Sequence, residues 1–361
     1  MGLAELRLEN VRCLRSAAIE LHPRLNLITG ENGSGKTSLL EAIYLLARGR
    51  SFRTRHTEQL IQHGEQKLLV FGRLGGTPLP GVEQQSLTQH AIGLAYHRRE
   101  GMEARIDGGP ITSLAQLSAA FPAQVIDPGI HRLVEEGPLH RRRWLDWAVF
   151  HVEPGFVLHW QHYSRALRQR NAALKSNADP TVWDRELVRL GELLTISRAR
   201  VVDALQPVWT RAVTDLAAVP ASLGFSNGWS KGQTLAESLA SHLEIDRERG
   251  STGYGPHRFD IVLRWDGHPV RDVVSRGQQK VLGAAMTLTM ARYLTDATGT
   301  APALLLDDPA AELDRPHTEA LLSAVRQLGS QLVATALRPE DTALGSPDRV
   351  FHVEQQGVQR V

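Results

Sequence analysis

The sequence predicts an α/β fold in which a mixed sheet carries a small helical second lobe as an insertion. An apolar run at residues 25–29 has the length of a buried strand and is followed by a glycine-rich segment and a helical pattern from Ser38. A second apolar run, residues 303–306, ends in two aspartates. Between these runs, apolar residues recur at three- and four-residue steps, which is typical of amphipathic helices.

The glycine-rich segment, residues 30–37, has the spacing Gly-x4-Gly-Lys-Thr of a phosphate-binding loop. Its glycines allow backbone conformations in which consecutive N–H groups point at phosphate oxygens beside a helix N-terminus. Lys36 adds a positive charge for the terminal phosphates of a nucleotide, and the Thr37 hydroxyl is a ligand for Mg²⁺. A glycine-rich turn that binds nothing is the alternative, and the flanking strand and helix patterns disfavour it. The predicted nucleotide-binding residues of this loop are Gly30, Glu31, Asn32, Gly33, Ser34, Gly35, Lys36 and Thr37.

The two aspartates after residues 303–306 have the form of a Walker B element, the second half of a nucleotide site. We expect Asp307 to hold Mg²⁺ and Asp308 to act as the general base that polarises the attacking water. A strand followed by an Asp-Pro turn is the alternative, and the phosphate loop in the same chain favours the nucleotide site. Lys36, Asp307 and Asp308 are therefore predicted catalytic residues, with ATP and Mg²⁺ as cofactors.

A third motif, Ser-Arg-Gly-Gln-Gln-Lys at residues 275–280, resembles the signature motif of the ATP-binding-cassette superfamily. Ser275 and the amides around Gly277 and Gln278 would offer a helix N-terminus to an anion. A simple helix N-cap is the alternative for this string taken alone. In that superfamily the signature of one subunit closes over the nucleotide held by another. The resemblance therefore implies a homodimer with two sandwiched ATP molecules, and it makes Ser275 a further catalytic residue, supplied by the other subunit.

Other superfamily positions are matched less closely. Residues 312–314 lie where the superfamily keeps its D-loop, which crosses the dimer interface. Thr335 stands at the usual position of the switch histidine, so the γ-phosphate sensor is left unassigned. Gln124 is a weak candidate for the Q-loop glutamine.

The length of the central helical stretch indicates which branch of the superfamily the chain resembles. Its amphipathic pattern is predicted to end near Pro207, so there is room for a small lobe and not for a long coiled coil. The separation of Lys36 from Ser275 is also larger than in a transporter ATPase, which keeps these elements on one compact domain. The pattern comprises Trp183, Leu187, Leu190, Leu194, Val201 and Leu205. The expected domains are residues 1–135 and 221–361 for the ATPase lobe and 136–220 for the helical lobe.

Composition excludes several classes of protein. A net charge of +2 means that any nucleic-acid binding depends on local patches. The single cysteine, Cys13, excludes an intramolecular disulfide and a cysteine-based zinc site. No apolar run approaches the roughly eighteen residues that span a bilayer, and the first residues lack a signal-peptide core. We therefore expect a cytoplasmic protein with no membrane partner.

The chain resembles the RecF family of bacterial recombination mediators along essentially its whole length. Ser-Phe-Arg-Thr at residues 51–54 and Gly-Pro-His-Arg at residues 255–258 are the strings most specific to that family. The resemblance also rests on residues 8–12, the phosphate loop, residues 40–44, 49–50, 141–146 and 169–171, and the signature motif. The segment after Walker B, residues 309–311, is looser than the family pattern.

The resemblance implies a DNA-repair ATPase. Such a protein binds gapped DNA or junctions of double and single strands with ATP, hydrolyses ATP slowly in a DNA-dependent way, and helps RecO and RecR to load RecA. Roles in DNA replication and the SOS response are implied too. A nucleotide-switched clamp for protein assembly, or another NTPase without DNA dependence, remains the alternative.

Several basic residues are candidates for phosphate contact, although such runs are more often solvated helix faces. They are the group at residues 140–143 and the series Arg165, Arg168, Arg170 and Lys175. Arg50, Arg53 and Arg55 are candidates for ATP sensing or lobe contact. Trp144 and Trp147 are expected in the core.

Overall fold

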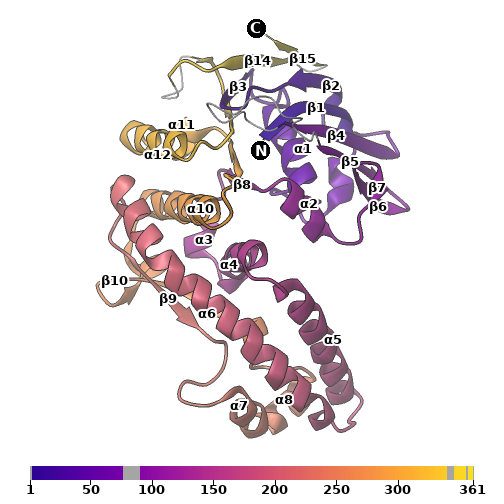
Figure 1. Cartoon of the computed structure of the whole chain (residues 1–361), viewed down its shortest axis with the longest axis vertical. Helices are drawn as coiled ribbons and strands as arrows, with labels where there is room; N and C mark the ends of the chain where they lie inside the picture. Colours follow the sequence, from indigo (N-terminus) through magenta and orange to yellow (C-terminus); the bar gives the residue numbers. More distant parts are fainter. Residues whose placement is uncertain (1, 76–89, 340–344, 355–356, 361) are drawn as a thin grey trace. The chain divides into compact units, whose positions relative to one another are not determined.

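The computed structural model describes residues 2–75, 90–339, 345–354 and 357–360, which group into two compact units (Figure 1). The first unit holds residues up to 130, residues 215–217 and residues from 284 onward, and the second holds residues 131–214 and 218–283. The α/β class, the mixed sheet and the inserted helical lobe are as the sequence predicts. The domain boundaries at 135 and 220 stay a prediction, and the second unit also includes residues 221–283.

A mixed sheet in the first unit places the two predicted halves of the nucleotide site at one edge. Its strand order is β15-β14-β3-β13-β12-β8, with β15 antiparallel to β14 and the other neighbours parallel. The carboxyl ends of parallel strands meet at the same edge of a sheet, where ligands commonly bind. The loops that follow β3 and β12 therefore emerge together, with β13 between them. The strands are β3 (Leu25–Thr29), β8 (Ala123–Ile126), β12 (Ala303–Leu306), β13 (Leu332–Ala336), β14 (Arg349–Glu354) and β15 (Gly357–Arg360).

An antiparallel sheet lies on the other side of helix α1 (Lys36–Arg48). Every residue of α1 from Ser38 to Ala47 is buried, because apolar side chains of both sheets pack around the helix in one core. A helix that is buried on all sides is held by packing, which fixes the direction of its N-terminus. The order of this sheet is β2-β1-β4-β5-β6-β7. Its strands are β1 (Gly2–Val11), β2 (Leu14–Glu20), β4 (Lys67–Gly75), β5 (His90–His97), β6 (Gly101–Ile106) and β7 (Gly109–Pro110).

The first unit has further described helices, and two of them contribute Leu60 and Leu117 to this core. These further helices are the 3₁₀-helix η1 (Thr57–Leu60), α2 (Leu114–Ala120), α11 (Pro309–Glu312) and α12 (Arg315–Gln327). Helix α10 (Arg276–Thr298) is the helix whose N-terminus the signature motif predicts, and it belongs to the first unit from Ala284. None of the helices in the described residues combines the length and the apolar character that a membrane crossing requires.

The second unit is mainly helical and contains one small sheet. Arg141 on α4 (Pro138–Val152) forms an ion pair with Asp260 on β10 (Asp260–Trp265), with 2.9 Å between nitrogen and oxygen. This pair joins the predicted helical lobe to strands beyond residue 220, which local sequence patterns do not reveal. The sheet order is β11-β10-β9. The other elements are α3 (Arg132–Glu135), α5 (Phe156–Lys175), η2 (Thr181–Trp183), α6 (Asp184–Asp215), β9 (Ser222–Ser226), α7 (Leu235–Ser241), α8 (Leu243–Arg249), η3 (Pro256–Arg258), β11 (His268–Pro269) and α9 (Val270–Val273).

The predicted end of the amphipathic helix near Pro207 is wrong. Helix α6 continues through Pro207 to Asp215. A proline inside a helix costs about 3 kcal/mol because it lacks the N–H group and crowds the preceding turn. Contacts on both sides offset this cost: Gln206 Nε2 donates to the Leu223 carbonyl at 2.9 Å, and Trp209 Nε1 donates to the Ala221 carbonyl at 2.6 Å.

Candidate nucleotide-binding site

The glycine-rich loop between β3 and α1 has the backbone that a phosphate-binding loop requires. Gly35, which precedes the first residue of α1, has φ of 116°, and Gly30 has φ of 148°. A side chain at Gly30 would also place its Cβ 2.5 Å from the backbone oxygen of Val353. Both positions therefore exclude residues with a Cβ, and the loop can turn its amides toward the helix N-terminus, where an anion is favoured.

The side chains of the loop fit a bound phosphate group. Ser34 Oγ is buried and has no hydrogen-bond partner among the described residues, which suits a donor for a phosphate oxygen. Lys36 Nζ donates to the carbonyls of Gly30 at 2.6 Å and Glu31 at 3.0 Å, so the ammonium group lies over the loop. Burial lowers the pKa of Lys36, and the nearby Asp308 and Asp307 oppose that shift. The loop therefore offers a hydroxyl and an amine at one place.

The structure brings the two predicted Mg²⁺ ligands into contact. Thr37 Oγ1 donates to Asp307 Oδ1 at 3.0 Å and to Oδ2 at 3.1 Å. Burial raises the pKa of Asp307, and the hydrogen bonds from Thr335 and Thr37 act in the opposite direction. The described residues contain no group of three or more His, Cys, Asp or Glu that would hold a metal alone. One carboxylate and one hydroxyl suit Mg²⁺, which takes its other ligands from water and substrate phosphates.

A cavity of about 820 Å³ joins these residues, and all of its lining belongs to the first unit. Its volume lies within the range of small-molecule sites, about 300–1,000 Å³. The lining includes Asp308 and most of the phosphate loop, as the sequence predicts. It also includes residues to which the sequence assigned no role in the site. These are Arg12, Cys13, Ser38, Glu58, Gln59, Ile61, His63, Arg98, Pro128 and Thr335. Arg53 was a candidate for ATP sensing, and it reaches this cavity, whereas Gln124 is absent from the lining.

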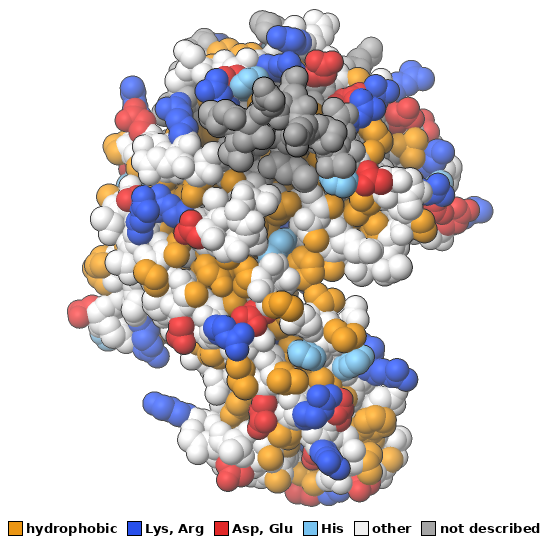
Figure 2. All heavy atoms as spheres, viewed as in Figure 1, with side chains coloured by type: hydrophobic (Ala, Val, Ile, Leu, Met, Phe, Trp, Pro, Cys, Tyr) orange, Lys and Arg blue, Asp and Glu red, His pale blue; other side chains and the backbone are white. Residues whose placement is uncertain are grey.

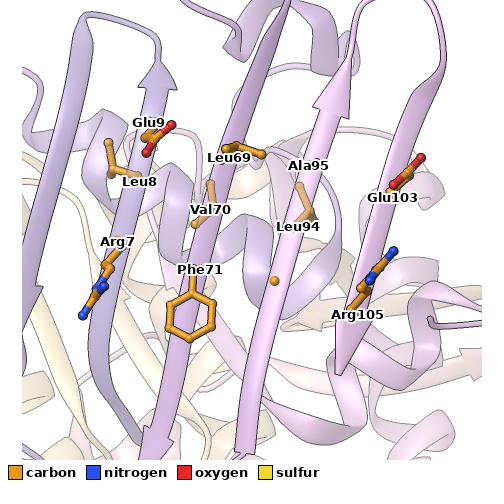
Figure 3. Close-up of a pocket in the computed structure, with 11 residues that line it drawn as sticks. Arg7, Leu8, Glu9, Leu69, Val70, Phe71, Leu94, Ala95, Glu103 and Arg105 are labelled. Carbon is orange, nitrogen blue, oxygen red and sulfur yellow. The ribbon is translucent and has the colours of Figure 1, made fainter. Parts of the chain in front are cut away.

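A second hollow, of about 360 Å³, lies on the outer face of the antiparallel sheet. Figure 3 shows its mostly apolar lining from four neighbouring strands, with Phe71 and Leu69 near the middle and charged side chains at the edges. Its lining includes neither the phosphate loop nor the aspartate pair. The chemistry of a nucleotide site therefore belongs to the larger cavity.

The signature residues lie in the second unit. Ser275, Gly277 and Gln278 are exposed, and Ser275 precedes the first residue of α10. The Gln278 backbone N–H donates to Ser275 Oγ at 3.3 Å, and the Ser275 N–H donates to Gln278 Oε1 at 2.9 Å. This reciprocal pair is a capping box, so the N-cap alternative is realised in the single chain. Exposure also leaves the motif accessible to a second subunit, and its part in catalysis stays a prediction.

Two of the predicted DNA-contacting arginines are buried. Arg170 is fully buried and pairs with Asp246 at 2.6 Å and with Asp184 at 2.7 Å. Arg141 is 6% exposed and pairs with Asp260. Both candidates are therefore wrong, because each guanidinium is taken up by acidic partners distant in the sequence. Arg143, Arg165, Arg168 and Lys175 are exposed, and Trp144 and Trp147 lie in the core as predicted.

Comparison with known proteins covers nearly the whole chain. The family model described as the RecF/RecN/SMC N-terminal domain matches residues 2–360. A protein of Shewanella woodyi named DNA replication and repair protein RecF is 38% identical over 98% of this chain and 97% of its own length. A protein of the same name from Pseudomonas fluorescens is 37% identical, again over 98% and 97% of the two chains.

Solved structures share the fold. A recombination mediator protein RecF bound to ATP, described as part of the RecFOR pathway, has a TM-score of 0.88 at 24% identity, over 100% of this chain and 97% of that one. An Smc head bound to a domain of ScpA has a TM-score of 0.61 at 15% identity, over 100% and 98% of the two chains. The sequence matches, which exceed a third identity over the full length, show more than the fold: the chain belongs to the RecF family.

Proposed function

We propose that the chain is an ATP-dependent DNA-binding protein of recombinational repair. The observation that carries this proposal is the cavity in which the phosphate loop, Lys36, Thr37 and the aspartates 307 and 308 come together. The names of the relatives, which concern DNA replication and repair, supply the DNA part of the proposal. The solved RecF structure with ATP supports ATP as the nucleotide.

In the proposed reaction, residues of this chain bind and orient the nucleotide phosphates and deprotonate the attacking water. The loop amides, Ser34 and Lys36 hold the phosphates, while Thr37 and Asp307 hold Mg²⁺, which would neutralise charge on the terminal phosphates. Asp308 takes a proton from the attacking water, whose oxygen bonds to the γ-phosphorus as the bond to the β–γ bridging oxygen breaks. ADP and phosphate are the products. We infer slow turnover that increases with DNA.

The proposed active form is a homodimer. Ser275 of one subunit would meet the nucleotide held by the other, and two sandwiched ATP molecules would close the pair on gapped DNA or on a junction of double and single strands. RecO, RecR and RecA are the proposed partners, in the cytoplasm, with roles in replication, repair and the SOS response. On the face drawn in Figure 2, basic and acidic side chains are interspersed. On that face the basic side chains do not form a continuous patch, and we propose that the dimer forms the DNA-binding surface.

The test measures DNA binding in three nucleotide states. Fluorescence anisotropy of a gapped duplex is recorded with ATP, with ADP and without nucleotide at fixed salt, because phosphate contacts make affinity salt-dependent. We expect binding with ATP only. Equal binding in all three states would favour a protein-assembly clamp, and rapid turnover without DNA would favour another NTPase.

Two variants separate ATP binding from dimerisation. Lys36→Met removes the charge at the phosphates and is expected to lose ATP, whereas Ser275→Arg is expected to keep ATP and fail to dimerise. Ser176→Arg is the matched control, since Ser176 is an exposed serine after α5 and outside the proposed interface motif. Normal ATP-dependent dimerisation of Ser275→Arg in analytical ultracentrifugation would refute the sandwich.

A further inference from the structure

Thr335 connects the two aspartates of the candidate site. It lies on β13, next to β12, the strand that Asp307 follows, and its side chain is fully buried. Its Oγ1 donates to Asp307 Oδ1 at 2.9 Å and accepts from the backbone N–H of Asp308 at 2.9 Å. A hydroxyl has one proton to donate, and here Asp307 receives it. One side chain thus restrains Asp307 through its carboxylate and Asp308 through its backbone.

The backbone of Asp308 needs such a restraint. Its φ is 49°, in the left-handed region that residues with a Cβ rarely adopt. Conformations of this kind persist where the surroundings hold them, and they cluster at functional sites. The Asp308 side chain lines the cavity, and no hydrogen bond from the described part of the chain reaches its carboxylate. The strained backbone therefore presents a carboxylate with free acceptor positions to the cavity.

The partners of the Thr335 hydroxyl both belong to the candidate site. A helical Ser or Thr hydroxyl commonly bonds a carbonyl of its own helix, whereas a strand residue such as Thr335 finds its partners on neighbouring segments. Thr335 bonds two residues after the end of the neighbouring strand, 28 and 27 positions away. The hydroxyl is therefore used at the site and not within its own strand.

We propose that Thr335 is a positioning residue for ATP hydrolysis, which fixes Asp307 where it would hold a cation and aims the Asp308 carboxylate at the attacking water. This inference rests on the proposed function. It gives a role to the threonine that the sequence presents only as a departure from the superfamily pattern. Nucleotide binding by the loop is expected to be independent of Thr335, because Lys36 and Ser34 make no hydrogen bond to it.

The test uses three replacements at one position in the full-length chain. Thr335→Ser keeps the hydroxyl, Thr335→Val keeps the shape without it, and Thr335→Cys keeps the volume with a weak donor. Steady-state hydrolysis of ATP with Mg²⁺ gives kcat and KM, calorimetric titration of ATP gives affinity, and thermal unfolding gives stability. We expect kcat of the valine variant to fall about 10–100-fold, as for other residues that orient ligands. ATP affinity and the kcat of the serine variant should stay close to those of the wild type.

Each outcome supports or overturns the inference. A graded kcat, serine above cysteine above valine, at similar ATP affinity supports positioning. If the valine variant does not fold, the comparison of serine with cysteine still decides. An unchanged kcat in the valine variant overturns the inference, and so does a loss in all three that follows their melting temperatures. A wild-type protein that neither binds nor hydrolyses ATP would instead refute the proposed function.

Discussion

Glu41 on helix α1 is a fully buried carboxylate that pairs with two arginine side chains lining the nucleotide cavity. Arg12 binds it through two nitrogens, at 2.8 Å each, and the Ser51 hydroxyl donates to the same carboxylate. Arg53 Nη1 lies 3.7 Å from Glu41 Oε2. Arg12 and Arg53 both line the cavity, whereas Glu41 does not. The carboxylate therefore acts on the site through the arginines that it holds.

Replacement of Glu41 by glutamine is expected to destabilise the protein and to weaken ATP binding. The amide keeps the shape but loses the charge that two guanidinium groups share, and a lost charged hydrogen bond costs about 1.5–3 kcal/mol. The midpoint of urea denaturation measures stability, and calorimetric titration of ATP should show at least a severalfold loss of affinity. Glu58→Gln is the control, because Glu58 also lines the cavity and, within the described part of the chain, its carboxylate pairs only with the exposed His56. Equal stability of the two variants would contradict the anchoring role.

The site residues that could be predicted from the sequence are those that belong to a short local motif. Lys36 and Thr37 follow from the spacing of the loop, and Asp307 follows from a strand that ends in carboxylates. The partners Glu41 and Thr335 stayed unassigned because their contacts join residues 28 or 29 positions apart, which no periodicity reveals. Arg170 was misjudged for the same reason, since its acidic partner Asp246 lies 76 positions away.

Helix α6 shows at the scale of an element how tertiary contacts override local signals. Trp209 follows the internal Pro207, is 2% exposed and donates its indole N–H to the Ala221 carbonyl. Pro207 removes one hydrogen bond of the helix, so the last two turns depend on packing against the segment that leads into β9. Of the predicted amphipathic face, the residues from Leu187 to Leu205 are buried in this helix, whereas Trp183 lies in η2 and the end of the helix was misplaced.

We expect Trp209→Phe to destabilise the second unit by about 1–2 kcal/mol, because the buried Ala221 carbonyl loses its donor. Trp209→Ala should cost more, about 3–5 kcal/mol, since it also leaves a cavity. Urea denaturation followed by far-UV circular dichroism measures both values. Trp183→Phe is the control, since Trp183 is only partly buried in η2. If Trp209→Phe unfolds at the same urea concentration as the control, packing after Pro207 does not hold this end of the helix.

At the scale of the whole molecule, both units bury apolar side chains and ion pairs, as Glu41 with Arg12 shows for the first. The core of the first unit is centred on an apolar cluster around α1, and apolar runs in the sequence predict a core of this kind. The second buries ion pairs, including Arg198 with Asp146 at 2.8 Å and Arg170 with Asp246 at 2.6 Å. Breaking such a pair leaves a buried charge and is strongly destabilising. The extension of this unit beyond residue 220 rests partly on these polar contacts, which is why the sequence did not reveal it.

His257 makes the second unit sensitive to acid. Its Nε2 donates to the Thr252 carbonyl at 3.1 Å, so Nδ1 accepts from the Tyr163 hydroxyl at 2.8 Å, and the ring is neutral. Burial lowers the pKa of His257 from 6.5 to about 4, and the charges of Arg258 and Arg142 act in the same direction. Between these pH values the unfolded chain binds a proton that the folded chain does not. The free energy of unfolding therefore rises with pH across this window.

We expect the wild-type second unit to lose up to about 3 kcal/mol as the pH falls from 7 to 4, at 1.36 kcal/mol per unit of pKa. His257→Gln removes this titration while its amide can still donate to Thr252 and accept from Tyr163. Only the wild type loses stability through this titration, so the difference in free energy of unfolding between wild type and variant should move in favour of the variant as the pH falls from 7 toward 5. Urea denaturation at pH 7, 6 and 5 measures the difference, with His159→Gln on the partly exposed part of α5 as the control. A difference between His257→Gln and the wild type that is the same at all three pH values would show that His257 is not held neutral by burial.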